Sequence, residues 1–367
     1  MFPAPGCLYS YGLMTDPLLL LRQKIDAVDQ QLLKLINERG ALAKQVGLIK
    51  HAASEPVYRP EREAQVLQKI ATANPGPLSN ESVQAVWREI ISACRAAEAP
   101  IRVAYLGPQG TYSEQAVRAQ FGVQVDALPC SSFDEVFRTV ETGSADFGVV
   151  PVENTTEGAV SRTLDLMLTT PLVISAELTL PIHHQLLTQS GTMDGVQRIL
   201  AHPQAYAQCQ LWLARHLPSI RIETVSSNGE AARIAAEDAS TAAIASTLAA
   251  ARYQLHVAAA NIQDDPNNRT RFGIIGRHVT LPSGRDQTSL ILSVPNRPGA
   301  VYEMLQPLAD HGVSMTRFES RPAKNGQWEY NFYVDIQGHV KDHKIAAALD
   351  ALKAHTAFFK VLGSYPA

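Results

Sequence analysis

The chain has 367 residues, of which 46% are hydrophobic and 18% are charged, a composition typical of a folded globular protein rather than a disordered one. This length exceeds what a single hydrophobic core usually serves, so two or three domains are expected. The 32 basic and 35 acidic residues leave a net charge of only -3, which gives no indication of a surface for nucleic acid or for an anionic membrane. We therefore expect small molecules as ligands.

The cysteines favour a reducing compartment and give no sign of a metal site. They are Cys7, Cys94, Cys130 and Cys209, which form no CxxC pair and have no histidine cluster of zinc spacing nearby. We expect a cytoplasmic protein. The first 21 residues contain no Lys or Arg and the apolar run at residues 18–21 is short, so neither a signal peptide nor a membrane span is expected. Residues 1–15 are interpreted as a loose leader without an assigned role.

A long helix is predicted to start at Asp16 and Pro17, because a carboxylate caps a helix well and proline is favoured at the first helical position. Apolar residues then recur in steps of four and three, at positions 21, 25, 28, 32, 35, 42, 46 and 49. This heptad pattern predicts a helix that runs to about residue 51 and packs against other helices. The one gap in the pattern holds Arg39, which on the pattern alone could equally be an arginine whose side chain reaches out from the seam to solvent.

Three basic residues lie along this helix at informative distances. At 1.5 Å per residue, Arg39 is roughly 16 Å from Lys50, whereas Arg22 is roughly 25 Å from Arg39. One small ligand could lie between Arg39 and Lys50, but it could not also reach Arg22 of the same helix. If all three residues serve one site, Arg22 must come from a second copy of the chain.

Two further helices are predicted, one that starts at Pro60 and one that follows Ser79. They carry the charged candidates Arg62, Glu63 and Glu98. Taken singly, each of these side chains is more readily explained as a solvated helix charge. A set of helices with several inward basic groups would nevertheless suit a dianionic ligand.

Four motifs occur together in this helical segment. They are Leu21-Arg-Gln-Lys-Ile-Asp-Ala-Val-Asp29, Asn37-Glu-Arg39, Val46-Gly-Leu-Ile-Lys50 and Pro60-Glu-Arg-Glu63. In combination they make residues 16–98 resemble the all-helical chorismate mutase domain. The resemblance implies an intertwined dimer. It also implies carboxylate-binding roles for Arg39, Arg62 and Arg22 of the second copy, contact of Lys50 with the ether oxygen, and contact of Glu63 with the ring hydroxyl.

The reaction of that family explains these residue types. Conversion of chorismate to prephenate is a pericyclic rearrangement that needs no nucleophile and no cofactor, only a compact conformer and stabilisation of the charge that grows on the ether oxygen. Two residues depart from the family pattern, since Arg59 stands where some members carry aspartate and Glu98 where some carry glutamine. A carboxyl group donates a hydrogen bond only while protonated, so Glu98 predicts mutase activity that falls as the pH rises.

Beyond the small-residue link at 96–100, the sequence alternates between predicted strands and helices. A strand over residues 101–107 enters a glycine-rich loop that matches no dinucleotide or phosphate-loop spacing. Further predicted elements are a helix at 133–142, strands at 146–152 and 172–178, and helices at 205–216 and 228–238. The acidic, hydroxyl-rich turn Pro151-Val-Glu-Asn-Thr-Thr-Glu-Gly158 follows a buried strand, where small ligands usually bind at the rim of an α/β sheet. The pattern predicts two α/β lobes around a cleft.

Several motifs in this segment also point to one family. They are Gly107-Pro-Gln-Gly-Thr-Tyr-Ser113, Pro151-Val-Glu-Asn-Thr155, His202-Pro-Gln204 with Gln208, and Asn268-Arg-Thr-Arg-Phe272. Residues 101–277 thereby resemble prephenate dehydratase, which implies two lobes like those of periplasmic binding proteins. The family's active-site roles would fall on Glu153, Asn154, Thr155, Gln208, Thr270 and Arg271. Ala201 departs from the family, because some members carry serine there.

Prephenate dehydratases remove CO₂ and hydroxide from prephenate to give phenylpyruvate. Because aromatisation of the ring supplies the driving force, the enzyme mainly needs a hydrogen-bond donor at the leaving hydroxyl and anchors for the side-chain carboxylate. Thr270 is the candidate donor, and Arg271 is a candidate anchor or structural clamp. Without the resemblance, Thr270 would be interpreted as a structural turn hydroxyl.

The terminal segment is predicted to have the order βαββαβ of a ferredoxin-like module, with strands at 287–294, 313–320, 328–336 and 357–364 and helices at 298–311 and 341–354. Its motifs Pro295-Asn-Arg-Pro-Gly-Ala-Val-Tyr302 and Glu319-Ser-Arg-Pro322 make residues 286–367 resemble the regulatory ACT domain. The resemblance implies L-phenylalanine bound where two such domains meet. The effector-binding candidates are Asn296, Gly299, Ala300, Val301, Glu319 and Ser320. The family usually reads Gly-Ala-Leu-Val at the first motif, so Val301 and Tyr302 could alter the selectivity for effector size.

The sequence therefore predicts a multidomain protein with an all-α mutase domain, a two-lobed α/β dehydratase domain and an α+β ACT domain. The expected function is that of a bifunctional enzyme of phenylalanine biosynthesis, without cofactor, inhibited by phenylalanine and assembled as a homodimer or larger homo-oligomer. Two alternatives stay open at this point. The helices could be only a dimerisation element on a dehydratase, or the middle and terminal modules could form a non-catalytic amino-acid sensor.

Overall fold

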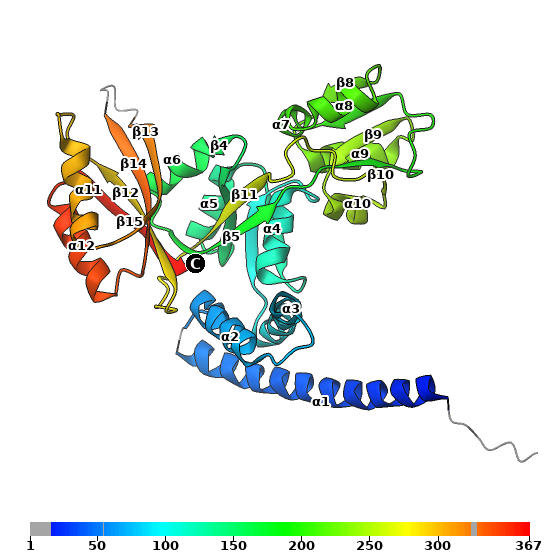
Figure 1. The fold of residues 1–367 in the computed structure, drawn as a ribbon, viewed down its shortest axis with the longest axis horizontal. Coiled ribbons are helices and arrows are strands. Elements are labelled where there is room, and N and C mark those ends of the chain that lie inside the picture. The colour runs from blue at the N-terminus through cyan, green and yellow to red at the C-terminus, as the bar shows by residue number, and fades with distance from the viewer. Residues whose placement is uncertain (1–15, 54, 324–328) are drawn as a thin grey trace, which may run out of the picture.

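A computed structural model describes residues 16–53, 55–323 and 329–367. Figure 1 shows a helical segment followed by a two-lobed α/β segment and a terminal module that lies against the first lobe. This arrangement confirms the predicted fold classes of all three segments. The predicted leader at residues 1–15 lies outside the described residues.

The helical segment consists of α1 (Pro17–Ala52), α2 (Pro60–Ala73) and α3 (Asn80–Glu98). As predicted, the Asp16 carboxylate caps α1 by accepting a hydrogen bond from the backbone of Leu18 at 3.0 Å. Only the C-terminal part of α1 packs closely, at Gly47, where a Cβ atom would lie 2.4 Å from Cγ of Glu98. The absence of a side chain at Gly47 therefore lets α3 approach α1. The N-terminal half of α1 extends away from the rest of the described chain (Figure 1).

The first lobe is a sheet with the order β2-β1-β3-β11-β5, in which β4 also pairs with β3. Its strands are β1 (Arg102–Leu106), β2 (Asp126–Cys130), β3 (Phe147–Asn154), β4 (Gly158–Ala159), β5 (Val173–Pro181) and β11 (Arg269–Gly276). Helices α4 (Tyr112–Phe121), α5 (Phe133–Glu141) and α6 (Ser161–Thr169) accompany them.

The second lobe has the strand order β10-β6-β9-β7-β8. Its elements are β6 (Gln185–Thr188), β7 (Arg198–Ala201), α7 (Pro203–Ala207), α8 (Gln210–His216), β8 (Arg221–Thr224), α9 (Asn228–Glu237), β9 (Thr241–Ala245), α10 (Thr247–Tyr253) and β10 (His256–Ala259). The chain crosses between the lobes twice, from β5 to β6 and from β10 back to β11. Ile182 and His184 of the first crossing line a cavity between the lobes.

The single helix predicted at 205–216 is wrong, because the chain is interrupted at Gln208 and Cys209. The Asp264 carboxylate accepts hydrogen bonds from the backbone of Leu211 and Trp212, each at 3.0 Å. These bonds satisfy amide groups in the first turn of α8, so a second helix can begin there. Asp264 is remote in sequence, and local patterning could not reveal the break.

The terminal module has the predicted order of strands and helices, and its sheet runs β13-β14-β12-β15. The elements are β12 (Asp286–Ser293), α11 (Ala300–Asp310), β13 (Met315–Pro322), β14 (Tyr330–Gln337), α12 (His343–Lys353) and β15 (Phe358–Pro366). Its sheet joins the core of the first lobe through Ile291, Tyr333 and Leu362. At Gly363 the backbone of β15 lies so close to β5 that a Cβ atom would be 2.0 Å from the carbonyl oxygen of Ile174.

The helical segment is joined to the first lobe by Tyr58, which lies between α1 and α2 and is only 2% exposed. Its ring packs against Phe121 and Phe147, with centroid distances of 4.9 and 5.2 Å. Its hydroxyl accepts a hydrogen bond from Nε2 of Gln120 at 2.6 Å. A residue of the helical segment thus completes the core of the neighbouring lobe.

We expect Tyr58→Ala to lower the free energy of unfolding by about 3–5 kcal/mol, the usual cost of truncating a buried aromatic side chain. Tyr58→Phe loses only the hydrogen bond from Gln120 and should cost about 1 kcal/mol. Urea denaturation measures both values, with Tyr302→Ala as the control because Tyr302 is 72% exposed. An unfolding midpoint of Tyr58→Ala equal to that of the control would contradict the shared core.

Candidate active sites

A cavity of 640 Å³ opens between the helices and gathers most of the basic candidates of the helical segment. The predicted residues that line it are Arg39, Lys50, Arg62, Glu63 and Glu98. Arg22 does not line it, because it lies on the exposed N-terminal half of α1. Leu281 and Pro282, from the connection between β11 and β12, form part of the wall.

Ion pairs hold the charged groups of this cavity in place. Nζ of Lys50 lies 2.8 Å from Oε1 of Glu98 and donates to the carbonyl oxygen of Val57 at 2.9 Å. Burial raises the pKa of Glu63, and the neighbouring Arg95 opposes this shift. Arg59, which also lines the cavity, pairs with Glu55 at 2.7 Å. The lining therefore holds basic groups with carboxylates close beside them.

Arg95 is a residue of this cavity that the sequence analysis missed. It forms an ion pair with Glu63, and its Nη2 donates to the carbonyl oxygen of Phe121 at 2.6 Å. Its guanidinium also lies over the ring of Tyr58, 5.1 Å from the centroid. The available signal was its spacing, since Arg95 follows the apolar Ile91 by one helical turn.

The cleft between the two lobes contains a cavity of 150 Å³ that brings together Asn154, Gln208 and Thr270. Further polar residues line this cavity that the sequence did not assign to the site, namely Tyr112, Ser113, His184, His202, Gln204 and Asn228. A neighbouring cavity of 950 Å³ shares Tyr112, Ser113, His202, Gln204 and Asn228 with it. The two cavities thus form adjoining parts of one cleft.

Glu153 and Arg271 lie outside both cavities, because side chains alternate between the faces of a sheet. In the pairing of β3 with β11, Asn154 is opposite Thr270 and Glu153 is opposite Arg271. The guanidinium of Arg271 contacts Glu177 at 3.2 Å and also pairs with Asp335 of the terminal module. These contacts link the sheet of the first lobe to the terminal sheet.

Two other contacts complete this link between the domains. Nε of Arg317, on β13, lies 3.0 Å from Oε2 of Glu153. Ser289 donates to Asp335 at 2.6 Å, which fixes the carboxylate that pairs with Arg271.

The predicted site residue Thr155 is exposed and lies outside both cavities. Its Oγ1 accepts a hydrogen bond from the backbone of Arg269 at 3.0 Å, so it stabilises the turn that follows β3.

The direction of the hydrogen bond between Asn154 and the hydroxyl of Thr270 can be assigned. Oδ1 of Asn154 accepts hydrogen bonds from the backbone of Thr156 and Glu157 at 3.0 and 3.1 Å, so the other end of the amide must be Nδ2. This Nδ2 donates to Oγ1 of Thr270 at 2.8 Å. Since Thr270 accepts this bond, its own proton is left for a group in the cavity.

His202 and Asn228 also present hydrogen-bond donors to the cleft. Burial lowers the pKa of His202, so its ring is neutral at pH 7. Its Nδ1 accepts from the backbone of Gln204 at 3.3 Å, which leaves the proton on Nε2. Oδ1 of Asn228 accepts from the backbone of His202 at 3.1 Å, which leaves the NH₂ group of Asn228 as a donor.

The polar groups that line the cleft could bind an anion without a basic side chain. Among the residues that the structure describes, no Lys or Arg lines either cleft cavity. The larger cavity includes the carboxylate of Glu230, which is paired with Arg233 at 2.8 Å. Helices α4 and α9 begin at the cleft, capped by Thr111 and Ser227, and the N-terminus of a helix attracts negative charge. The cleft can therefore bind carboxylates through neutral hydrogen-bond donors and helix N-termini.

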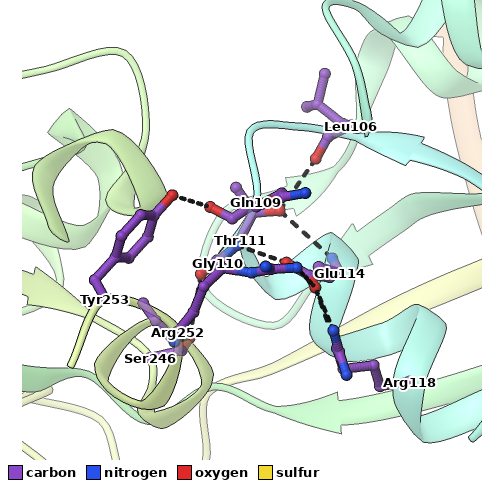
Figure 2. Close-up of polar contacts among 10 residues, drawn as sticks. Leu106, Gln109, Gly110, Thr111, Glu114, Arg118, Ser246, Arg252 and Tyr253 are labelled. Carbon is purple, nitrogen blue, oxygen red and sulfur yellow. Dashed lines mark hydrogen bonds and ion pairs between the residues drawn. The ribbon is translucent and has the colours of Figure 1, made fainter. Parts of the chain in front are cut away.

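The glycine-rich loop at the cleft is fixed by the fully buried carboxylate of Glu114 (Figure 2). Glu114 accepts hydrogen bonds from the backbone of Gly110 at 2.7 Å, from Arg118 at 2.9 Å and from Arg252 of the second lobe at 2.7 Å. Burial acts to raise its pKa, but these hydrogen bonds outweigh burial and lower it. Tyr253 of the second lobe donates to the carbonyl oxygen of Gln109 at 3.2 Å, so the loop is attached to both lobes (Figure 2).

The effector candidates occupy mostly exposed parts of the terminal module. Gly299 adopts a φ of +82°, which favours glycine, at the start of α11, and Ala300 behind it is buried. Asn296 and Val301 are exposed. Glu319 and Ser320 lie on β13, the edge strand of the sheet.

In the described ranges, no group of histidine, cysteine, aspartate and glutamate residues could hold a metal ion. Within the same ranges, no helix is long and apolar enough to cross a membrane.

Comparison with known proteins identifies three family models in chain order. Residues 21–99 match chorismate mutase type II, residues 103–280 match prephenate dehydratase and residues 288–354 match the ACT domain. A prephenate dehydratase from Arthrobacter aurescens, solved in complex with L-Phe, is similar with a TM-score of 0.67 and 35% identity. That similarity covers 73% of this chain and 90% of the solved one.

Two curated relatives span nearly the whole chain, and both are named bifunctional chorismate mutase/prephenate dehydratase. The protein from Neisseria gonorrhoeae is 49% identical over 348 residues, which cover 94% of this chain and 96% of the relative. The protein from Aquifex aeolicus is 44% identical over 350 residues, which cover 94% of this chain and 97% of the relative. The chain therefore belongs to the family of bifunctional chorismate mutase/prephenate dehydratases.

Proposed function

We propose that this chain catalyses two consecutive reactions and is inhibited by their end product. The helical domain, over residues 16–98, rearranges chorismate to prephenate. The two-lobed domain, over residues 101–277, converts prephenate to phenylpyruvate, and phenylalanine acts through residues 286–367. The observation that carries the proposal is that one chain holds a basic cavity and a separate donor-lined cleft, each with candidates for one of these reactions. The bifunctional relatives favour this function over a mere dimerisation element or an amino-acid sensor.

In the mutase cavity, Arg39 and Arg62 bind the carboxylates of chorismate and Lys50 stabilises the ether oxygen. Their common position in the lining of one cavity supports these roles. Arg22 would complete the site from a second copy. The apolar seam of α1 supports this homodimer, because Leu21, Ile25 and Val28 are each more than half exposed in the single chain. A second α1 laid along the seam would cover these side chains.

In the dehydratase cleft, electrons flow from the carboxylate that leaves to the hydroxyl that leaves. The C–C bond to the ring carboxylate breaks and releases CO₂, its electron pair enters the ring, and the C–O bond breaks. The leaving hydroxide takes up one proton and departs as water. Thr270 polarises this hydroxyl, and Asn154 orients Thr270. Neutral donors suit this reaction, since a guanidinium paired with the departing carboxylate would stabilise the ground state.

The link between Arg271, Glu153, Asp335 and Arg317 offers a route for inhibition. It attaches the terminal sheet to the strand pair whose opposite face carries Asn154 and Thr270. An effector that shifts the terminal module would bias the position of these strands and hence the geometry of the cleft.

The overall function is tested by supplying purified protein with chorismate and following prephenate and phenylpyruvate, with and without phenylalanine. We expect phenylpyruvate to form and phenylalanine to suppress it. Prephenate that accumulates alone would refute the dehydratase assignment. No turnover at all would favour the amino-acid sensor, and an absence of any phenylalanine effect would leave the terminal module without a regulatory role.

Replacement of Thr270 tests the donor at the leaving hydroxyl. Thr270→Ala should lower dehydratase turnover by about 10²- to 10³-fold, the usual cost of removing one such donor. Thr270→Ser keeps the hydroxyl and should retain most of the turnover. Mutase turnover by the same variants is the internal control and should not change. Near-normal phenylpyruvate formation by Thr270→Ala would remove Thr270 from the mechanism.

Replacement of Glu98 tests how its carboxylate affects the mutase cavity. This carboxylate lies 2.8 Å from the ammonium group of Lys50. Glu98→Gln removes the negative charge and supplies an amide that can donate to the ether oxygen, so we expect the mutase turnover of this variant at pH 7 to exceed that of the wild type. Dehydratase turnover by the same variant is the control and should not change. Mutase turnover equal to or below that of the wild type would show that the Glu98 carboxylate does not limit the reaction.

A further inference from the structure

A continuous set of hydrogen bonds, buried except for a partly buried one at Tyr112, connects the two lobes through the dehydratase cleft. It runs through Tyr112, His184, Gln208, Asn268, Asn154 and Thr270. His184 lies in the crossing from β5 to β6 and is 2% exposed, and Asn268 lies in the crossing from β10 to β11 and is 1% exposed. Gln208 occupies the break between α7 and α8. The path thus contains residues of both lobes and of both crossings.

The direction of these hydrogen bonds is set at one end by the main chain. The amide of Asn154 is oriented by the backbone groups of Thr156 and Glu157, so its Nδ2 donates to Oδ1 of Asn268 at 2.9 Å. Asn268 must then use its own Nδ2 as a donor, and this atom lies 2.8 Å from Oε1 of Gln208. Oε1 of Gln208 is therefore an acceptor, and the same oxygen lies 3.0 Å from Nε2 of His184.

Only one form of His184 fits this arrangement. Burial lowers the pKa of His184, so the ring is neutral at pH 7 and carries a single proton. A proton on Nε2 makes a hydrogen bond to Gln208, whereas a proton on Nδ1 would turn a lone pair toward the oxygen of Gln208. With Nε2 protonated, Nδ1 is free to accept from the hydroxyl of Tyr112, which lies 3.0 Å away. That hydroxyl also lies 2.8 Å from the carbonyl oxygen of His183, and its one proton can serve either acceptor.

We propose that His184 is a positioning residue of the dehydratase, which fixes the side-chain amide of Gln208 so that its NH₂ group faces the substrate. The proposal rests on the dehydratase function described above. Gln208 lines the cavity, and two donors hold its oxygen on the side away from that NH₂ group. Without His184 the oxygen of Gln208 keeps only one donor, Nδ2 of Asn268, so a single hydrogen bond holds that end of the amide. The NH₂ group would then be aimed less firmly at an anionic substrate.

A double-mutant cycle separates this role from a general structural one. The variants are His184→Leu, Gln208→Ala and the combination of both, with kcat and KM measured for prephenate in the full-length protein. We expect His184→Leu to lower kcat by roughly 10- to 100-fold, less than the loss from removing a donor outright. If His184 acts through Gln208, His184→Leu should cost almost nothing further in the Gln208→Ala background.

Two further measurements complete the test. His184→Gln should recover most of kcat, because its terminal NH₂ group can replace the Nε2–H donor. Mutase turnover by each variant reports whether the protein is folded and should equal that of the wild type. Equal losses from His184→Leu in both backgrounds, or no recovery with His184→Gln, would overturn the proposal. If the wild type itself fails to convert prephenate, the proposed dehydratase function is wrong, and that outcome is distinct from a failure of the His184 variants.

Discussion

The antiparallel pairing of β3 with β11 sets Asn154 opposite Thr270 and Glu153 opposite Arg271. Because neighbouring side chains leave opposite faces of a strand, one short strand pair serves two purposes. One face presents to the cleft the hydroxyl of Thr270, which accepts a hydrogen bond from Asn154. The other face carries the ion pairs to the terminal sheet. This strand pair therefore borders the cleft on one face and contacts the terminal module on the other.

The two cavities meet the demands of two dianionic substrates in different ways. The mutase cavity is lined by arginines and a lysine, which suits a rearrangement in which both carboxylates stay in place. The dehydratase cleft offers neutral donors and helix N-termini instead, which suits a reaction in which one carboxylate must depart. If the proposed function holds, the same class of ligand meets a basic lining where both carboxylates stay and a neutral set of donors where one carboxylate leaves.

Local patterning predicted much of the fold. The cap at Asp16, the helix that follows Ser79 and the βαββαβ order of the terminal module are confirmed, because each depends on neighbouring residues. The break at Gln208 escaped prediction, because it depends on the remote Asp264. Family motifs indicated Arg39, Lys50 and Thr270, but a motif does not say which face of a strand a residue occupies.

The residues that sequence reasoning missed share one property, since their importance arises from contacts between distant segments. His184 gains its significance from Gln208 and Tyr112, and Arg95 from Glu63 and Phe121. Neither residue is unusual in its own stretch of sequence. Their partners become visible only when the chain is folded and the hydrogen-bond directions can be followed.

The position of Tyr58 has a consequence for separating the helical segment from the dehydratase domain. Its ring fills a place between Phe121 and Phe147, although it belongs to the preceding helical segment. A cut in the link at residues 96–100 would leave these two rings of the dehydratase facing water. If the gene were split there, a substitution would be needed that either fills the place of the Tyr58 ring or replaces an exposed phenylalanine with a polar residue. A stand-alone dehydratase should accordingly carry a compensating side chain of its own there.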